Sequence, residues 1–165
     1  MLLVFGGICT ALSIILLTVS TYIHINTFAI LALCSALVGV VQIEGGTKYS
    51  LLTFFSTSVL LLVMPVDRLN LIYYAGFFGY YPVIKFFVER LSDIKKELVI
   101  KTVIFLILSF LGVWILKDFL SAGVSAKINW KWIALLGAVL MHVYDYALSI
   151  FFAFYEKKIR NKIRR

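Results

Sequence analysis

The chain has 165 residues, of which 62% are hydrophobic and 15% are charged. Water-soluble domains average about 45–50% apolar residues, so this composition argues against a soluble protein and predicts one that lies in a lipid bilayer. The net charge of +8 comes mostly from two basic clusters. Such clusters fit anionic lipid headgroups, and they do not favour nucleic acid as a partner.

Apolar segments of membrane-spanning length follow one another along the whole chain. A spanning helix needs about 20 apolar residues. The first segment has no charged leader region and no small-residue cleavage site, so we expect a retained helix rather than a signal peptide. The sequence predicts an all-α integral membrane bundle that forms a single transmembrane domain over residues 1–165. Its six transmembrane helices are expected at residues 2–22, 27–43, 49–64, 69–88, 98–116 and 130–155.

Lysine and arginine counts in the short loops predict the orientation of the bundle. They are highest in the loop between the fourth and fifth helices and in the tail, EKKIRNKIRR. Because positively charged loops stay inside, both termini are expected in the cytoplasm. We therefore expect a multi-pass protein of the bacterial inner, or cytoplasmic, membrane.

The first helix begins LLVFGGICTALSI and carries small residues four positions apart. Gly6 with Thr10, and Gly7 with Ala11, form a flat strip where another helix can approach closely. Two interpretations are open at this point. The strip could face a partner protein, or it could face the sixth helix of the same chain.

The middle of the chain has two breaks in its apolar pattern. The segment EGGTK, residues 44–48, separates the second helix from the third. In the fourth helix, Pro82 removes a backbone hydrogen bond and is expected to introduce a kink, and Gly79 permits close helix approach. Lys85 lies only five residues before Arg90, so we expect its side chain to reach the headgroups as an interfacial anchor.

Asp145 is the costliest residue to place in lipid. It lies in the apolar stretch AVLMHVYDYALSIFF, where an ionised carboxylate needs a partner or water. His142 is three residues earlier, on the same side of the helix. The pair could serve substrate, proton or conformational coupling. Alternatively, it could form an interhelical hydrogen-bond clamp with Lys85 or with a tyrosine of the fourth helix.

A second polar set is expected at the outer ends of the helices. Aromatic and polar groups with apolar walls can recognise a small ligand, although tyrosine, tryptophan and arginine also collect in ordinary interface belts. Trp132 fits the belt best, whereas Asn70, Tyr73 and Tyr74 share one helical face and fit either role. The candidate substrate-binding residues are Asn26, Arg68, Asn70, Tyr73, Tyr74, Trp132, His142 and Asp145.

Common enzyme signatures are missing from the sequence. There is no HExxH motif, no G-x-S-x-G elbow and no P-loop lysine motif. Cys9 and Cys34 lack metal-ligand spacing and are expected to be buried apolar residues. We therefore expect no enzyme activity, no catalytic residue, no cofactor and no metal site.

The predicted architecture resembles the substrate-binding (S) component of energy-coupling factor (ECF) transporters. The segment GGICTAL resembles the Ala-x-x-x-Ala-type strip on the first helix of those proteins. The segments LIYYAGFFGYYPVIKFFVERL and YDYALSIFFAFYEKKIRNKIRR resemble small bacterial membrane proteins of the same general type. The resemblance implies capture of a vitamin-like small molecule from the outer side. It also implies that Gly7 and Ala11 contact a transmembrane T component, while separate ATPase subunits supply energy.

Two other functions remain open at this level. One is a non-catalytic scaffold or assembly protein of the bacterial envelope, which would act through lateral helix faces and the basic tail. The other is a membrane-embedded enzyme acting on lipid or isoprenoid, for which His142 and Asp145 would need a further acidic residue nearby.

Overall fold

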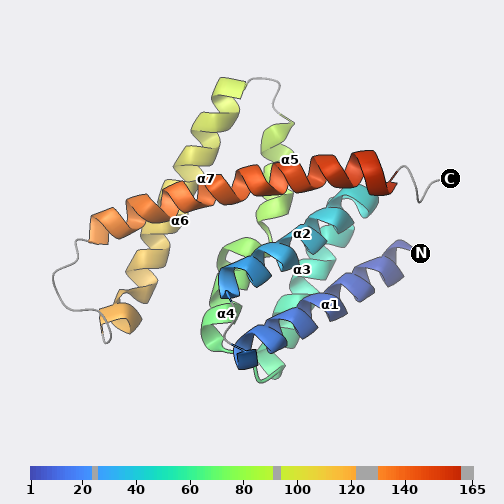
Figure 1. Ribbon diagram of the computed structural model, residues 1–165, viewed down its shortest axis with the longest axis horizontal. Helices are drawn as coiled ribbons and strands as arrows, with labels where there is room; N and C mark the ends of the chain where they lie inside the picture. Colours follow the sequence, from blue (N-terminus) through green and yellow to red (C-terminus); the bar gives the residue numbers. More distant parts are fainter. Residues whose placement is uncertain (24–25, 91–93, 122–129, 161–165) are drawn as a thin grey trace. The chain divides into compact units, whose positions relative to one another are not determined.

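The computed structural model describes all residues except 24–25, 91–93, 122–129 and 161–165 (Figure 1). Every regular element among the described residues is helical, which confirms the all-α prediction. The elements are α1 (Leu2–Ile23), α2 (Thr27–Gly45), α3 (Thr47–Val63), α4 (Arg68–Tyr73), the π-helix η1 (Tyr74–Phe78), α5 (Tyr81–Glu89), α6 (Ile94–Ser121), α7 (Trp130–Phe154) and the π-helix η2 (Tyr155–Arg160).

Most of these helices are long and apolar enough to cross a membrane. Five qualify among the described residues: Leu2–Ile23, Thr27–Gly45, Arg68–Glu89, Lys95–Trp114 and Trp132–Lys158. The sixth predicted span corresponds to α3, whose 17 residues fall at the short end of the spanning range. A multi-pass membrane bundle is thus confirmed. The cytoplasmic placement of both termini stays a prediction.

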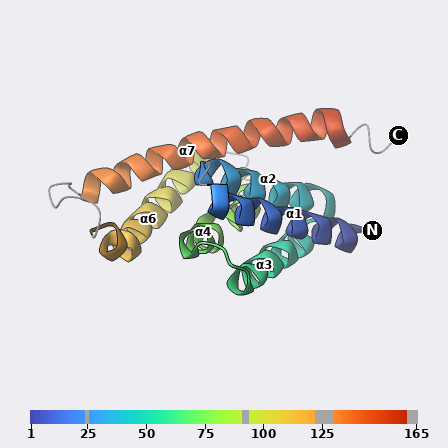
Figure 2. The same cartoon turned by 60° about the horizontal axis from the view of Figure 1, so that its bottom comes forward.

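The chain divides into two compact units. Unit 1 comprises Met1–Phe87 together with Phe151–Arg165, and unit 2 comprises Val88–Ile150. In unit 1, α1, α2 and α3 pack against one another, and η1 lies against α2 and α3 (Figures 1 and 2). The membership of both units in a single domain stays a prediction.

The interior of unit 1 combines apolar side chains with small hydroxyl side chains. Its apolar cluster is Leu17, Leu31, Cys34, Phe54, Leu61 and Tyr74. Beside it, Thr10 donates to the Gly6 carbonyl at 3.0 Å and Thr57 donates to the Thr53 carbonyl at 2.8 Å. Small residues let membrane helices approach closely, and a hydroxyl bonded to its own helix brings no unpaired group into the contact. Cys9 and Cys34 are buried, as predicted.

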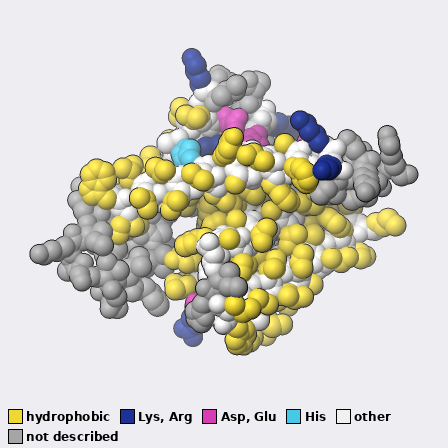
Figure 3. Space-filling view, viewed as in Figure 1, with side chains coloured by type: hydrophobic (Ala, Val, Ile, Leu, Met, Phe, Trp, Pro, Cys, Tyr) yellow, Lys and Arg dark blue, Asp and Glu magenta, His cyan; other side chains and the backbone are white. Residues whose placement is uncertain are grey.

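The outer surface of these helices is strongly apolar. Large hydrophobic side chains such as Ile8, Ile15 and Phe55 are exposed in unit 1, as are Leu136 and Val143 in unit 2. Figure 3 shows hydrophobic side chains over the visible faces of α1, α2 and α7. An apolar surface of this extent suits contact with lipid and not with water.

A single glycine separates α2 from α3. Gly46 has φ = 78°, a left-handed conformation that glycine adopts without the steric cost of a Cβ atom. Its N–H donates to the Gln42 carbonyl at 3.0 Å, which caps the end of α2. The predicted break at residues 44–48 is therefore confirmed.

The fourth predicted span consists of three helical pieces. The N–H of Gly79 donates to the Tyr74 carbonyl at 2.8 Å, which is the five-residue spacing of a π-helix. Pro82 lies in the first turn of α5, where its missing N–H costs no hydrogen bond. The interruption thus lies at η1, before the proline. A Cβ atom on Gly79 would lie 2.5 Å from the Phe54 ring, so the predicted close approach at Gly79 is confirmed.

The anchor prediction for Lys85 is wrong. Its side chain is 1% exposed, so it is buried within the protein and does not extend to the headgroups. The prediction used only the distance of Lys85 from the helix end and did not consider the direction in which the side chain points. The extra residue in the π-helical turn rotates all later residues about the helix axis. Lys85 shares a helical face with Tyr81 and Val88, which are buried as well.

In unit 2, α6 and the part of α7 up to Ile150 form an antiparallel pair. Lys101 meets Asp145, whereas Ser109, further along α6, donates to the carbonyl of Ala134, which lies earlier in α7, at 2.6 Å. Gly137 allows this close approach, because a Cβ atom there would lie 2.5 Å from the Ser109 hydroxyl oxygen. The register of the two helices is thus fixed by polar contacts.

Candidate functional site

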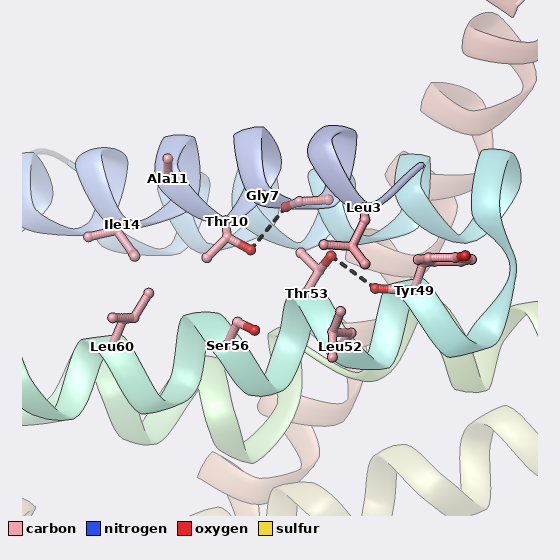
Figure 4. Close-up of a pocket in the computed structure, with 11 residues that line it drawn as sticks. Leu3, Gly7, Thr10, Ala11, Ile14, Tyr49, Leu52, Thr53, Ser56 and Leu60 are labelled. Carbon is pink, nitrogen blue, oxygen red and sulfur yellow. Dashed lines mark hydrogen bonds between the residues drawn. The ribbon is translucent and has the colours of Figure 1, made fainter. Parts of the chain in front are cut away.

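A groove runs along unit 1 between α1 and α3, with a volume of about 340 Å³. We call it the α1–α3 groove. Its α1 wall includes Gly7 and Ala11, for which the resemblance implies a partner contact (Figure 4). The groove is lined by Leu3, Gly6, Gly7, Thr10, Ala11, Ile14, Tyr49, Leu52, Thr53, Ser56 and Leu60.

The two small-residue pairs of α1 have different surroundings. Gly6 and Thr10 are buried, and a Cβ atom on Gly6 would lie 3.0 Å from the Thr53 hydroxyl oxygen. Gly7 and Ala11 are exposed, and a Cβ atom on Gly7 would meet nothing within 4 Å. The first pair therefore packs against α3 of the same chain. The second pair leaves open space on the same helix.

The floor of the groove is polar, although its ends are apolar. Thr10 and Ser56 face each other across it, and Ile14 and Leu60 close one end (Figure 4). The Thr10 and Thr53 hydroxyl groups each donate to a carbonyl of their own helix, with 3.0 Å between the two oxygen atoms. Their oxygens still have lone pairs that can accept hydrogen bonds. A lipid tail offers no hydrogen-bond donor, whereas a helix with serine, threonine or Cα–H groups does.

The predicted ligand residues of unit 1 gather only in part. Asn70 is buried and donates from its amide nitrogen to the Thr21 hydroxyl at 3.3 Å. The Tyr73 ring packs on Phe28 with 5.5 Å between ring centroids. Asn26 is exposed and occupies the N-cap position of α2. Its side chain makes no capping hydrogen bond. Arg68 is exposed at the start of α4.

Tyr74 lies deeper than a ligand contact at the helix ends would require. Its side chain is 0% exposed and belongs to the apolar core of unit 1. It is also the first residue of η1, and its ring lies 6.1 Å from that of Phe54. Its position therefore supports packing of the π-helical segment against α3.

Asp145 is part of a compact charged group in unit 2. Lys101 donates to Glu97 at 2.7 Å, to Asp145 at 2.9 Å and to Glu89 at 3.0 Å. We call these four residues the Lys101 cluster. The side chains of Lys101 and Asp145 are only 9% and 14% exposed. Asp145 thus joins α7 to α6, and Glu89 brings the end of α5 to the same point.

His142 lies one turn before Asp145 and contacts α6 as well. One ring nitrogen, Nε2, is 3.1 Å from the Thr102 hydroxyl, and the other, Nδ1, is 2.9 Å from the Ala138 carbonyl. The ring packs edge-on against Phe105 with 4.8 Å between centroids. Both residues of the predicted pair therefore contact α6, through Lys101 and Thr102. The clamp interpretation had named Lys85 or a tyrosine of the fourth helix as the partner, and that partner stays a prediction. Trp132, near the start of α7, is 68% exposed.

The predicted ligand set is divided between the two units. Asn26, Arg68, Asn70, Tyr73 and Tyr74 belong to unit 1. Trp132, His142 and Asp145 belong to unit 2. A single chamber formed by all eight residues stays a prediction.

Sequence reasoning missed several residues of these sites. Lys101 was not assigned to a site, and Thr21, Thr53 and Ser56 were not singled out. One signal could have found Lys101: it is a lysine within an apolar helix, four residues after Glu97, so it lies in reach of a carboxylate. Among the described residues, no group of three or more His, Cys, Asp or Glu is placed to hold a metal ion.

Comparison of the chain with models of known protein families, with characterised proteins and with solved structures finds no match.

Proposed function

We propose that this chain is the substrate-capture subunit of an ECF-type membrane transporter. In this role it takes up a vitamin-like small molecule from the outer side, carries out no chemistry and relies on ATPase subunits for energy. The α1–α3 groove is the single observation that carries the proposal, because Gly7 and Ala11 line it and remain open there. The resemblance of the sequence supplies the class of transporter.

The groove is proposed to receive a helix of a separate transmembrane subunit, the T component. A helix with small residues would bring its backbone close to Gly7, where no atom lies within 4 Å of a Cβ position. Its polar groups would bond to the Ser56 hydroxyl, which lines the groove and is partly exposed. Apolar side chains of the partner would pack on Leu3, Ile14 and Leu60 at the ends.

The ligand is proposed to bind at the end of unit 1 that holds Asn70 and Tyr73. The Asn70 amide and the Thr21 hydroxyl provide donors and acceptors there, and the rings of Tyr73 and Phe28 provide an aromatic wall. Apolar walls with a few fixed polar groups are typical of small-molecule sites. Gly7 and Ala11 lie on α1, away from these residues, so partner binding and ligand binding are separable by mutation.

The test is purification of the tagged chain from its native membranes followed by native mass spectrometry. The wild-type protein is expected to retain a small molecule and to copurify with a membrane subunit and ATPases. The Gly7→Leu variant should lose the protein partners and keep the small molecule. The leucine side chain fills the α1–α3 groove but does not reach the proposed ligand site. Gly112→Leu is the matched control, because a Cβ atom on Gly112 in α6 also meets nothing within 4 Å.

Three outcomes would separate the alternatives. Protein partners without any retained small molecule would favour the envelope scaffold. Loss of partners in both glycine variants would mean that the groove is not the contact. A wild-type chain that retains neither a partner nor a small molecule would contradict the proposed function as a whole.

A further inference from the structure

The helices α6 and α7 are both longer than the hydrocarbon layer of a bilayer is thick. α6 has 28 residues and α7 has 25. At a rise of about 1.5 Å per residue they extend about 42 Å and about 38 Å, whereas the hydrocarbon layer is about 30 Å thick. Helix length alone therefore does not determine which part of each helix lies in lipid.

Two tryptophans lie at the same level of this helix pair. The antiparallel register pairs Lys101 with Asp145, and the hydrogen bond from Ser109 to α7 shows that the register continues along both helices. Trp114 is 13 residues after Lys101 on α6, and Trp132 is 13 residues before Asp145 on α7. Both therefore lie about 20 Å from the ion pair, on the same side of it. They are 67% and 68% exposed, and we call them the tryptophan pair.

An apolar surface extends from the tryptophan pair toward the other end of the two helices. Phe110 on α6 and Val139 on α7 are exposed there. The surface ends at Lys96, which is exposed in the first turn of α6. Lys96 is 18 residues before Trp114, or about 27 Å along the helix, which matches the hydrocarbon thickness of about 30 Å.

The sequence changes from apolar to charged just beyond the tryptophan pair. Lys117 and Asp118 are the next charged residues after Trp114, and Lys131 directly precedes Trp132. Tryptophan collects at the membrane–water boundary because its ring is largely apolar while its N–H donates a hydrogen bond. The tryptophan pair thus lies where such a boundary is expected on both helices.

We propose that Trp114 and Trp132 form one interfacial anchor, whose partner is the headgroup layer of the bilayer. The anchor places the hydrocarbon layer between the tryptophan pair and Lys96. The Lys101 cluster then lies near the opposite boundary of that layer, because Lys101 is only five residues, or about 8 Å, from Lys96. The anchor is independent of the proposed transport function, since it requires neither a ligand nor a protein partner.

Depth-dependent fluorescence quenching tests the anchor. The full-length chain has three tryptophans, so two single-tryptophan variants keep either Trp114 or Trp132 and replace the others with phenylalanine. Each variant is placed in bilayers that contain phospholipids brominated near the headgroup or near the chain end. We expect both tryptophans at the headgroup boundary, at depths that agree within about 5 Å, the rise of one helical turn.

A third variant is the matched control. It replaces all three natural tryptophans with phenylalanine and adds Val139→Trp, because Val139 is exposed on α7 seven residues after Trp132. The new tryptophan should lie about 10 Å nearer the bilayer centre. Natural tryptophans that differ in depth by more than about 5 Å, or that lie as deep as the control, would overturn the proposal.

A second measurement decides the question if these variants do not fold. The chain carrying only Trp130→Phe is labelled with 5-fluorotryptophan, so that two ¹⁹F signals remain. A spin label at the lipid headgroup should broaden both signals more than a label at the chain end does. Either signal broadened more by the chain-end label would contradict the anchor as well.

Discussion

The two units use different chemistry to hold helices together. In unit 1 the contacts among α1, α2 and α3 combine an apolar cluster with small and hydroxyl side chains, such as Ser50, which donates to the Val38 carbonyl at 3.2 Å. In unit 2 the contact between α6 and α7 depends on a buried cation with three carboxylates. The stability of unit 1 should therefore fall when a side chain is enlarged, and the stability of unit 2 should fall when a charge is removed.

The largest expected effect is in unit 2. Lys101→Met leaves three carboxylates without their shared cation, which should lower the free energy of unfolding by about 3–5 kcal/mol. Thermal unfolding in detergent measures the change. Lys48→Met is the control, because Lys48 is exposed at the start of α3. Adding Asp145→Leu to Lys101→Met should recover part of the loss. Equal stability of the two lysine variants would contradict the role of the cluster.

The next effect is in unit 1 and comes from volume. Gly79→Ala places a methyl group 2.5 Å from the Phe54 ring, which is itself held by Tyr74 and Tyr80, so the free energy of unfolding should fall by about 1–3 kcal/mol. Gly76→Ala, three residues earlier, meets nothing within 4 Å and should be neutral or stabilising. Chemical unfolding of both variants measures the two free energies. A larger loss of stability in Gly76→Ala than in Gly79→Ala would contradict the prediction.

The smallest effect distinguishes two buried serines of unit 1. Ser50→Ala removes an interhelical hydrogen bond and should cost about 0.5–1 kcal/mol, the usual range for such bonds in membrane proteins. The Ser20 hydroxyl is buried with no hydrogen-bond partner among the described residues, so Ser20→Ala should cost nothing or stabilise slightly. Unfolding midpoints of the two variants test the difference. A greater cost for Ser20→Ala would show that its hydroxyl has a partner.

The helices could be predicted because lipid imposes a length and a composition on them. The first span was expected at residues 2–22 and α1 is Leu2–Ile23, and Gly46 ends α2 inside the predicted break. Orientation around a helix axis could not be predicted in the same way. Gly6 and Gly7 are adjacent glycines, so the sequence alone does not distinguish them. The position of α3 decides which of the two is covered.

Partners across helices were the second thing that the sequence could not supply. Lys101 looked like an ordinary charge near a helix end, because its three carboxylates are 4, 12 and 44 residues away. Its role depends on the register of α6 against α7, which Ser109 and Gly137 fix through a close backbone contact. The burial of Lys85 depends in turn on which face of α5 packs within the protein.

Site-specific photo-crosslinking in native membranes tests the central claim most directly. A photoreactive residue is placed at Ala11, on the rim of the α1–α3 groove, or at Leu12, which is exposed on α1 outside the groove. We expect position 11 to give an adduct with a different membrane protein and position 12 to give none. Equal adducts at both positions, no adduct at position 11, or an adduct with a second copy of this chain would contradict the claim that the groove receives a partner subunit.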